Sequence, residues 1–344
     1  MFEDSNVALF AGSGGELFAR RMCAYMNMKL GRSEAFKFSD GNTFVRVQDS
    51  VRDRNVYLVQ PIGNKPNDEF TEILFFVDAL KRSNALAVTL AMPYFGYAKG
   101  DKKDEPRVSI RARVCAESME LAGCDRFITM DLHSPQVQGF FKRPMDHLYA
   151  MPMLCEYAKR KIDISNAVIV SPDAGYAKQA RKFGKWLELP VAIGDKQRLD
   201  HTEHAEVLEV LGQVSGRDAL IVDDFSTSGG TLKTVADALR RQGANHIHAM
   251  LSHNIISKEG VDLLNESCIE QIISTDTLYN ENIVGHTKFK TVSVAPMFAE
   301  TIIRYHNSQS INTMFTMLDE AIVDAGMELA QLDLPTLQAM QPDD

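Results

Sequence analysis

The chain has 344 residues, of which 45% are hydrophobic, and it carries a formal net charge of -9. This length and apolar content suit two domains with real hydrophobic cores, which excludes a disordered or fibrous protein. The acidic balance argues against a general nucleic-acid binder, because such affinity comes mostly from Lys and Arg neutralising phosphates.

Short β-branched or apolar runs recur along the chain, and each ends in a polar or glycine-containing loop. We expect strands in the runs at 7–15, 55–63, 87–97, 126–134, 167–176, 219–230, 246–253 and 271–278. Between them, segments such as 72–83 and 232–244 place apolar residues at three- and four-residue spacing, which is typical of helices. This alternation predicts an α/β protein with mostly parallel sheets flanked by helices. Ligands of such sheets bind beyond the carboxyl ends of the strands.

The sequence also contains an internal echo. DALKRSNALAVTLAMPY, from Asp78, lines up with DALRRQGANHIHAMLSH, from Asp237, and GGELFARR, from Gly14, lines up loosely with AGYAKQAR, from Ala174. Both pairs are offset by about 160 residues, from 78 to 237 and from 14 to 174. Two pairs of similar segments with nearly the same separation favour a duplicated domain over chance similarity. We therefore predict two related α/β domains, at 1–150 and 151–318, and a surface tail at 319–344 with no assignable function.

The five cysteines show neither CxxC nor the Cys/His spacing of a zinc site, so we expect buried free thiols and a reducing compartment. The N-terminal segment MFEDSNVALF lacks the basic start and the apolar stretch of a signal peptide. No segment approaches the roughly 18 uninterrupted apolar residues of a membrane span. We therefore expect a cytoplasmic protein without a membrane partner.

The stretch VDDFSTSGGT, at 222–231, joins a predicted strand to a predicted helix. The first N–H groups of a helix lack intrahelical partners and attract anions, and Gly229 and Gly230 let a phosphate approach the backbone. Asp223 and Asp224 would repel that phosphate unless they face another part of the same ligand. Because vicinal sugar hydroxyls donate hydrogen bonds to carboxylates, the stretch predicts a binding loop for ribose 5-phosphate. The alternative is an ordinary strand-to-helix turn capped by Asp and Ser.

A hydrophobic-V-D-D run followed by a Ser/Thr/Gly loop resembles the phosphoribosyl-diphosphate motif of the phosphoribosyltransferase fold. Further motifs occur in order: FSDG (38–41), VDALKR (77–82), PYFGYA (93–98), MDLHSPQVQGFF (130–141), VSPDAG (170–175) and DKQR (195–198). With them the chain resembles the ribose-phosphate pyrophosphokinases, also called phosphoribosyl-diphosphate synthetases. The resemblance covers nearly the whole chain except the tail.

The resemblance implies two duplicated phosphoribosyltransferase-type (type I) domains, each a mostly parallel sheet flanked by helices. It implies a homo-oligomer built from dimers, of which a hexamer is one form. It further implies an enzyme that, with Mg2+, transfers the β,γ-diphosphate of ATP to the 1-hydroxyl of ribose 5-phosphate. The products are phosphoribosyl diphosphate and AMP, and nucleic acid is not a partner.

The resemblance also assigns roles to individual residues. Lys196 and Arg198 are implied as catalytic cations on a mobile loop that closes over the transferring diphosphate, and the polar stretch after them is expected to be flexible. His133 and Asp173, each after a predicted strand, are implied as Mg2+-site residues. The implied ATP-binding residues are Phe38, Asp40, Asn42, Lys99, Asp101, Lys102 and His133. The implied ribose-phosphate-binding residues are Asp223, Asp224, Thr227, Ser228, Gly229, Gly230 and Thr231.

Each of these features has a structural alternative when it is taken alone. A single His after a strand is more often structural than a ligand, and Lys196 with Arg198 could be two ordinary surface cations. The loop KGDKKDEPR, at 99–107, has the composition of a solvated charged turn as much as of a triphosphate contact. Only the motif context favours the functional interpretation.

Several positions depart from the family pattern around both substrates. Gly100 stands where a Gln helps to read adenine, and Asn42 stands where a Glu is usual. Thr227 replaces the third acid of the ribose-phosphate loop. A Lys offers a point charge where Arg offers a planar fork, so the lysines near Gly100 are not equivalent to the family's arginines. The departures are Asn42, Lys99, Gly100, Lys102, Tyr176, Gln179 and Thr227.

These departures leave other hypotheses open. The same diphosphoryl transfer could use a larger ribose-5-phosphate compound, such as ADP-ribose, as its acceptor. The chain could be a non-catalytic regulatory homologue, although such a homologue would lose Lys196, Arg198 or His133 as readily as the nucleotide contacts. A phosphoribosyltransferase is disfavoured, because that activity needs only one domain of this fold.

Overall fold

The computed structural model describes residues 6–198 and 206–341, and this part of the chain divides into two compact units. Unit 1 comprises residues 1–149, 277–279 and 293–344, and unit 2 comprises 150–276 and 280–292. The first boundary, at 149/150, lies beside the expected one. Residues 293–318 were expected in the second domain, but they pack in unit 1, and so does the expected tail from 319 onward.

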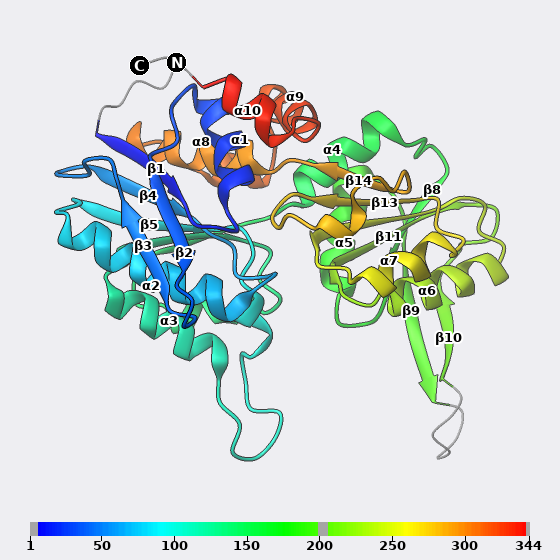
Figure 1. Ribbon diagram of the computed structural model, residues 1–344. Coiled ribbons are helices and arrows are strands. Elements are labelled where there is room, and N and C mark those ends of the chain that lie inside the picture. Colours follow the sequence, from blue (N-terminus) through cyan, green and yellow to red (C-terminus); the bar gives the residue numbers. More distant parts are fainter. Residues whose placement is uncertain (1–5, 199–205, 342–344) are drawn as a thin grey trace. The chain divides into compact units, whose positions relative to one another are not determined.

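Unit 1 is built on a sheet of five parallel strands (Figure 1). In spatial order the strands are β1 (Val7–Ala11), β4 (Asn55–Val59), β5 (Ala87–Met92), β6 (Arg126–Met130) and β7 (Met145–Leu148). These strands are short, apolar and largely buried, as expected for a parallel sheet that is covered on both faces.

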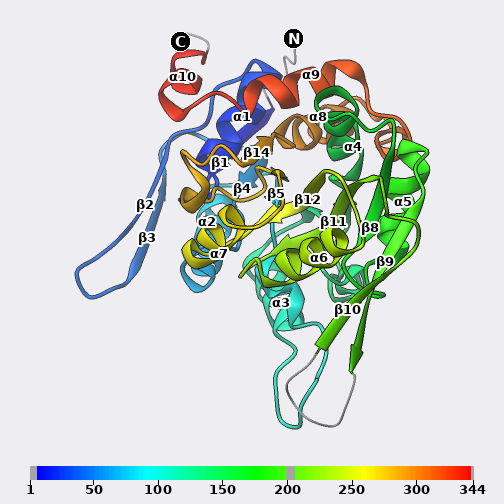
Figure 2. The ribbon, with the colours of Figure 1, turned by 90° about the vertical axis from the view of Figure 1, so that its right-hand side faces the viewer.

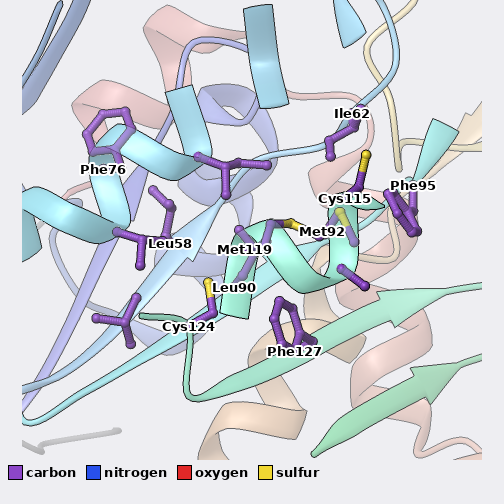
Figure 3. Close-up of a cluster of buried hydrophobic side chains, with 14 of the residues drawn as sticks. Leu58, Ile62, Phe76, Leu90, Met92, Phe95, Cys115, Met119, Cys124 and Phe127 are labelled. Atoms are coloured by element: carbon purple, nitrogen blue, oxygen red, sulfur yellow. The ribbon is translucent and has the colours of Figure 1, made fainter. Parts of the chain in front are cut away.

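Two helices, α2 (Pro66–Arg82) and α3 (Arg111–Ala122), cover one face of this sheet. The core between them contains Leu58, Phe76, Leu90 and Met119, all fully buried (Figure 3). α2 begins with Pro at its first position and ends with Lys81 and Arg82, which suits the helix dipole.

The opposite face of the sheet is covered by α1 (Glu16–Met26) and α8 (Ala295–His306), whose Phe18 and Phe298 rings meet edge to face at 5.2 Å. α9 (Glu320–Leu329) packs on α8, and α10 (Leu334–Ala339) packs on α1. The buried Arg21 of α1 donates hydrogen bonds to the carbonyls of Ala330 and Leu332, 3.2 Å from each. Residues 319–341 are therefore a folded part of unit 1.

A separate antiparallel hairpin, β2 (Ser33–Lys37) and β3 (Thr43–Val47), projects from unit 1 (Figure 2). Neither strand was predicted, because each is short and only partly buried. The ion pair between Lys37 and Asp68, 2.7 Å apart, ties the hairpin to α2.

Unit 2 is built on a seven-stranded sheet in which only the edge strand β10 runs antiparallel. In spatial order the strands are β10 (Glu206–Leu211), β9 (Val191–Arg198), β8 (Ala167–Ser171), β11 (Asp218–Ser226), β12 (Ile247–Asn254), β13 (Gln271–Thr275) and β14 (Phe289–Val292). α6 (Gly230–Arg241) and α7 (Lys258–Asn265) cover one face, and α4 (Met151–Lys161) and α5 (Ala177–Leu187) cover the other. The remaining short helices of the described chain are η1 (Gly96–Lys99), η2 (Pro135–Phe140), η3 (Glu281–Ile283) and η4 (Asn312–Phe315).

The predicted α/β class is confirmed, and each of the eight predicted strands is present. Both sequence echoes fall on matching elements: one on α2–β5 and α6–β12, the other on the starts of α1 and α5. The expectation of a flexible stretch after Arg198 is wrong for 206–209, which belong to β10, while 199–205 lie outside the described residues. The cysteines are free thiols, and none of the described helices could span a membrane.

Candidate active site

In unit 2, the parallel pairing of β8 with β11 brings two acidic loops to one edge of the sheet. Ile221 of β11 pairs with Val170 of β8, so both strands end on the same side. Asp173 lies two residues beyond β8, and Asp223 and Asp224 lie in the last half of β11. The edge therefore carries three carboxylates, although Asp173 and Asp223 are 50 residues apart in the sequence.

Asp223 is the most perturbed of these acids. Its pKa is raised from 3.8 to about 8, chiefly by burial of the carboxyl, then by the charge of Asp224 and more weakly by that of Asp173. Its Oδ1 accepts the N–H of Asp224 at 2.9 Å, and Oδ1 of Asp224 accepts the N–H of Phe225 at 2.9 Å. At neutral pH the pair therefore retains a proton and presents both donor and acceptor atoms to a ligand.

The loop from Thr227 to Gly229 joins β11 to α6 and is held from behind by α7. Gly229 has φ +74, and a Cβ there would lie 2.7 Å from Cγ of Leu264, so only glycine fits. The N–H of Ser257 donates to the carbonyl of Thr227 at 2.8 Å. The hydroxyl side chains of Thr227, Ser228 and Thr231 are exposed. The loop therefore directs hydroxyls and the start of α6, at Gly230, toward solvent, where an anion could bind.

Asp173 caps the turn before α5. Its Oδ1 accepts the N–H of Tyr176 at 3.0 Å, and its carbonyl accepts the hydroxyl of Ser171 at 2.7 Å. The side chain of Asp173 is nevertheless exposed, so its other oxygen remains accessible to a ligand. Tyr176, at a position where a Gly is usual, forms the N-terminal boundary of α5, which also contains Gln179.

Lys196 and Arg198 lie at the end of β9, which is the neighbour of β8. β9 continues beyond its pairing with β8 as a two-stranded ribbon with β10, in which Lys196 pairs with Leu208 and Arg198 with Glu206. The side chains of Lys196 and Arg198 lie outside the described residues. Their strand places both backbones at the same end of the sheet as Asp173.

In unit 1, His133 follows β6 in a short loop before η2. Asp131 has φ +36, a left-handed conformation that is uncommon outside glycine and costs on the order of 1 kcal/mol. The side chain of Leu132 is buried and that of His133 is exposed, so the loop presents His133 to solvent.

The loop at 99–107 follows β5 and η1 and extends beyond α3 (Figure 1). Lys99 and Lys102 are exposed and Asp101 is half-buried. Gly100 has no room for a side chain, because a Cβ there would lie 2.6 Å from Nε of Arg111. Sequence reasoning missed Arg111, which fills this space from the first residue of α3.

The FSDG motif forms the turn of the β2–β3 hairpin. Phe38 is 50% exposed and packs edge to face on Phe36 at 5.1 Å. Asp40 accepts two hydrogen bonds from Asn42, from its N–H at 3.0 Å and from its side-chain amide at 2.8 Å. The backbone bond, followed by the side-chain bond, lowers the pKa of Asp40. Asn42, at the usual Glu position, therefore holds Asp40 in the turn.

Unit 1 brings only part of its predicted set together. β5 and β6 are neighbouring parallel strands, so the loop at 99–107 and His133 leave the same edge of the sheet. The hairpin that carries Phe38, Asp40 and Asn42 projects in another direction (Figure 2). Among the described residues, no three His, Cys, Asp or Glu side chains gather in a metal-binding group.

Two family models match the chain. The N-terminal domain of ribose phosphate pyrophosphokinase matches residues 7–123, and the phosphoribosyl synthetase-associated domain matches residues 199–316. The chain is 38% identical over 317 residues to ribose-phosphate pyrophosphokinase 1 of Streptococcus pyogenes serotype M1, covering 91% of this chain and 98% of that one. It is 36% identical over 315 residues to the ribose-phosphate pyrophosphokinase of Bacillus subtilis (strain 168), covering 92% and 99%.

A solved structure agrees with these relatives. The fold is similar to that of phosphoribosylpyrophosphate synthetase from Mycobacterium smegmatis, with a TM-score of 0.83, 31% identity and coverage of 88% of this chain and 100% of that one. The resemblance found in the motifs is thereby confirmed over almost the entire length. The chain belongs to the ribose-phosphate pyrophosphokinase family.

Proposed function

We propose that this chain transfers the β,γ-diphosphate of ATP to the 1-hydroxyl of ribose 5-phosphate, giving phosphoribosyl diphosphate and AMP. The observation that carries the proposal is the open glycine loop beside an acid pair at the β11–α6 junction, in a chain that aligns with pyrophosphokinases over nearly its whole length. The departures at Gly100 and Asn42 lie outside this junction, and the departure at Thr227, inside it, leaves the acid pair and the two glycines in place. Neither the larger acceptor nor the regulatory homologue is favoured by any of the relatives.

The acceptor site is proposed at the unit 2 edge. The exposed hydroxyls of Thr227, Ser228 and Thr231 and the N–H groups at the start of α6 suit the 5-phosphate. Asp223 and Asp224 suit the ribose hydroxyls, because these oxygens accept hydrogen bonds and are held by the backbone of β11. If both carboxylates accept ribose hydroxyls in the complex, Asp223 must release the proton that it retains in the free chain.

The transfer step is proposed to rely on Lys196 and Arg198. The 1-hydroxyl attacks the β-phosphorus in line and releases its proton to solvent, its oxygen–phosphorus bond forms, and the bond from that phosphorus to the AMP oxygen breaks. Negative charge grows on the transferring and leaving oxygens, so nearby cations stabilise the transition state more than the bound substrates. β9 supports the proposal because both residues lie on it beyond its pairing with β8, toward the end of the sheet at which Asp173 follows β8.

The donor contacts are proposed in unit 1. Phe38 offers an exposed ring on which a base could stack, with Asp40 and Asn42 in the same turn. Lys99 and Lys102 offer exposed cations to a triphosphate, Asp101 adds a polar contact, and His133 leaves the same edge of the sheet. The hairpin projects from its own unit with Phe36 also exposed, which supports the proposed homo-oligomer.

Mg2+ is proposed as the metal of the reaction. Mg2+ keeps several waters and uses one or two protein carboxylates together with substrate phosphates, so it needs no closed protein cage. The exposed carboxylate of Asp173 fits such a ligand, and His133 is proposed as a further contact. When bound, the ion would neutralise phosphate charge. The free thiols support a cytoplasmic location.

The test is to incubate the chain with Mg2+, ATP and ribose 5-phosphate and to measure AMP and the mass of the sugar product. We expect equal amounts of AMP and phosphoribosyl diphosphate. A parallel reaction with ADP-ribose should release far less AMP. No AMP with ribose 5-phosphate would contradict the proposal, and AMP with ADP-ribose alone would replace it by the larger acceptor.

Lys196→Ala should lower kcat by at least about 100-fold while changing KM for ribose 5-phosphate by less than about threefold, because the cation acts mainly in the transition state. The matched control is Lys185→Ala, which removes an exposed lysine of α5 in the same unit. This control should keep wild-type kinetics. Equal kcat for wild type and Lys196→Ala would refute the role of Lys196.

A further inference from the structure

The loop that presents His133 is tied to the neighbouring strand by a histidine side chain. β6 and β7 pair in parallel, with Thr129 opposite His147 and Met130 opposite Leu148. The N–H of Asp131 extends this ladder by donating to the carbonyl of Leu148 at 3.1 Å. The next donor, the N–H of Leu132, has its partner in the imidazole of His147, at 2.9 Å from Nε2. The side chain of His147 thus continues the ladder where the β7 backbone leaves it.

In this hydrogen bond the donor and the acceptor are fixed. A backbone N–H can only donate, so Nε2 of His147 accepts with its lone pair. The bond is buried, and His147 is only 8% exposed. A buried backbone donor that loses its partner is costly, so the bond fixes the position of Leu132.

The imidazole is itself held from its other sides. The side-chain amide of Gln138 lies beside the imidazole, with its nitrogen 3.2 Å from Nδ1. The ring of Tyr149 lies against the imidazole, with centroids 4.6 Å apart. Gln138 also donates to the carbonyl of Pro135 at 2.9 Å, at the start of η2. His147 therefore contacts both ends of the segment that contains His133.

The conformation of this segment needs such support. Asp131 has φ +36, and a non-glycine residue keeps a left-handed backbone only where its surroundings hold it. The side chain of Leu132, the next residue, is buried, and that of His133 after it is exposed. Fixing the N–H of Leu132, in the peptide that joins it to Asp131, restricts the direction in which His133 leaves the sheet.

We propose that His147 is a positioning residue for the reaction: it accepts the N–H of Leu132 and so holds His133 in the orientation required for the donor. The proposal rests on the proposed function for the role of His133, but not for the hydrogen bond itself. His147 does not touch substrate in this account. Its removal should misplace His133 while leaving the acceptor site of unit 2 unchanged.

The variants that test this are His147→Ala, which removes the acceptor, and His147→Gln, whose side-chain oxygen can reach the position of Nε2. His246→Ala is the matched control, because His246 is an exposed histidine of unit 2 paired with Glu270. Hydrogen exchange of the Leu132 amide is measured in the full chain without substrates. AMP formation then gives kcat and KM for each variant, and thermal unfolding shows that each is folded.

We expect Leu132 to exchange at least about tenfold faster in His147→Ala than in wild type, because the amide loses its partner. We expect kcat to fall about 10- to 100-fold, as found when a supporting residue behind a reactive group is removed. KM for ribose 5-phosphate should stay the same. His147→Gln should recover most of both effects, and His246→Ala should show neither.

Two results would overturn the proposal. One is wild-type exchange of Leu132 in folded His147→Ala, and the other is faster exchange with unchanged kcat, which would make His147 structural only. If the wild-type chain forms no AMP, the proposed function fails. The Leu132 exchange then still decides whether His147 holds the loop.

Discussion

Two glycine-containing loops of this protein join a strand to a helix, and they differ in what satisfies their backbone. In unit 1, the loop between β1 and α1 is bonded to the protein's own side chains. Glu72 accepts the N–H of Ser13 at 3.0 Å and its hydroxyl at 2.8 Å, and Gln60 accepts the N–H of Gly14 at 3.2 Å. A Cβ at Gly15 would lie 2.1 Å from the carbonyl of Val59, so this loop packs directly on β4.

In unit 2, the loop between β11 and α6 is open. Its hydroxyl side chains are exposed, and only Ser228 caps it locally, accepting the N–H of Gly230 at 3.4 Å. The nearby acids Asp223 and Asp224 accept N–H groups of their own strand. Internal side chains thus satisfy the donors of the unit 1 loop, which is structural, whereas the unit 2 loop suits the proposed acceptor site.

The largest effect is expected from Gly229→Ala, which breaks the open loop. The new methyl group would meet Leu264 at 2.7 Å in a backbone with φ +74, so the loop must move. We expect kcat/KM for ribose 5-phosphate to fall about 100-fold, because a displacement of about 1 Å in a binding loop has effects of this size. Steady-state kinetics and thermal unfolding measure it.

Gly216→Ala is the matched control for this change. Gly216 has φ +71 but is exposed, and a Cβ there would meet nothing within 4 Å. The control should lose about 1 kcal/mol of stability from the left-handed backbone and keep wild-type kcat/KM. Similar kinetics for the two variants would show that the unit 2 loop does not bind the acceptor.

A somewhat smaller effect is expected from Glu72→Ala in the closed loop. It leaves the N–H and the hydroxyl of Ser13 without their acceptor, which should lower the free energy of unfolding by about 2 kcal/mol. Denaturant unfolding measures this loss, and Glu72→Gln should recover part of it. KM for ribose 5-phosphate should not change in either variant. Lost substrate binding at full stability would show instead that the unit 1 loop is a ligand site.

The last effect, of similar size but limited to high pH, concerns the pH dependence of the open site. Asp223 has a pKa of about 8 in the folded chain against an ordinary value of 3.8, so the folded state binds more protons between these pH values. Its contribution to stability is therefore full below about pH 4 and is lost as pH rises toward 8. Asp223→Asn removes this loss and should be more stable than wild type at pH 8 by on the order of 2 kcal/mol, with little difference at pH 4.

Unfolding of both proteins across this range tests the assignment. A stability difference that does not vary with pH would show that Asp223 is not the group that retains the proton. Asp218→Asn is a suitable control, since Asp218 begins the same strand, far along β11 from the glycine loop.

The central strands could be predicted from the sequence because they are continuous apolar runs. The remaining strands could not, because they lack such runs. β2, β3, β7 and β14 are short and only partly buried, and β10 is the edge strand of its sheet, next to β9. Such strands are specified by their neighbours more than by their own composition. The helices α9 and α10 were missed because their apolar residues, such as Ile322 and Leu337, become interpretable only against α1 and α8.

The candidate site divides in the same way. Asp223, Asp224 and the glycine loop could be predicted because their chemistry is contiguous in the sequence. The contacts of Arg111 with Gly100 and of His147 with Leu132 could not, because they form only through the fold. Neither Arg111 nor His147 belongs to a recognisable functional motif, so only the three-dimensional structure connects them to the site.

The comparison of the two loops is tested most directly by hydrogen exchange of the full chain with and without ribose 5-phosphate. The account predicts slower exchange at 223–233, which contains the acids, the open loop and the first turn of α6, and unchanged exchange at 11–16. Protection at 11–16 without protection at 223–233 would contradict it, because the acceptor would then bind the loop that Glu72 closes.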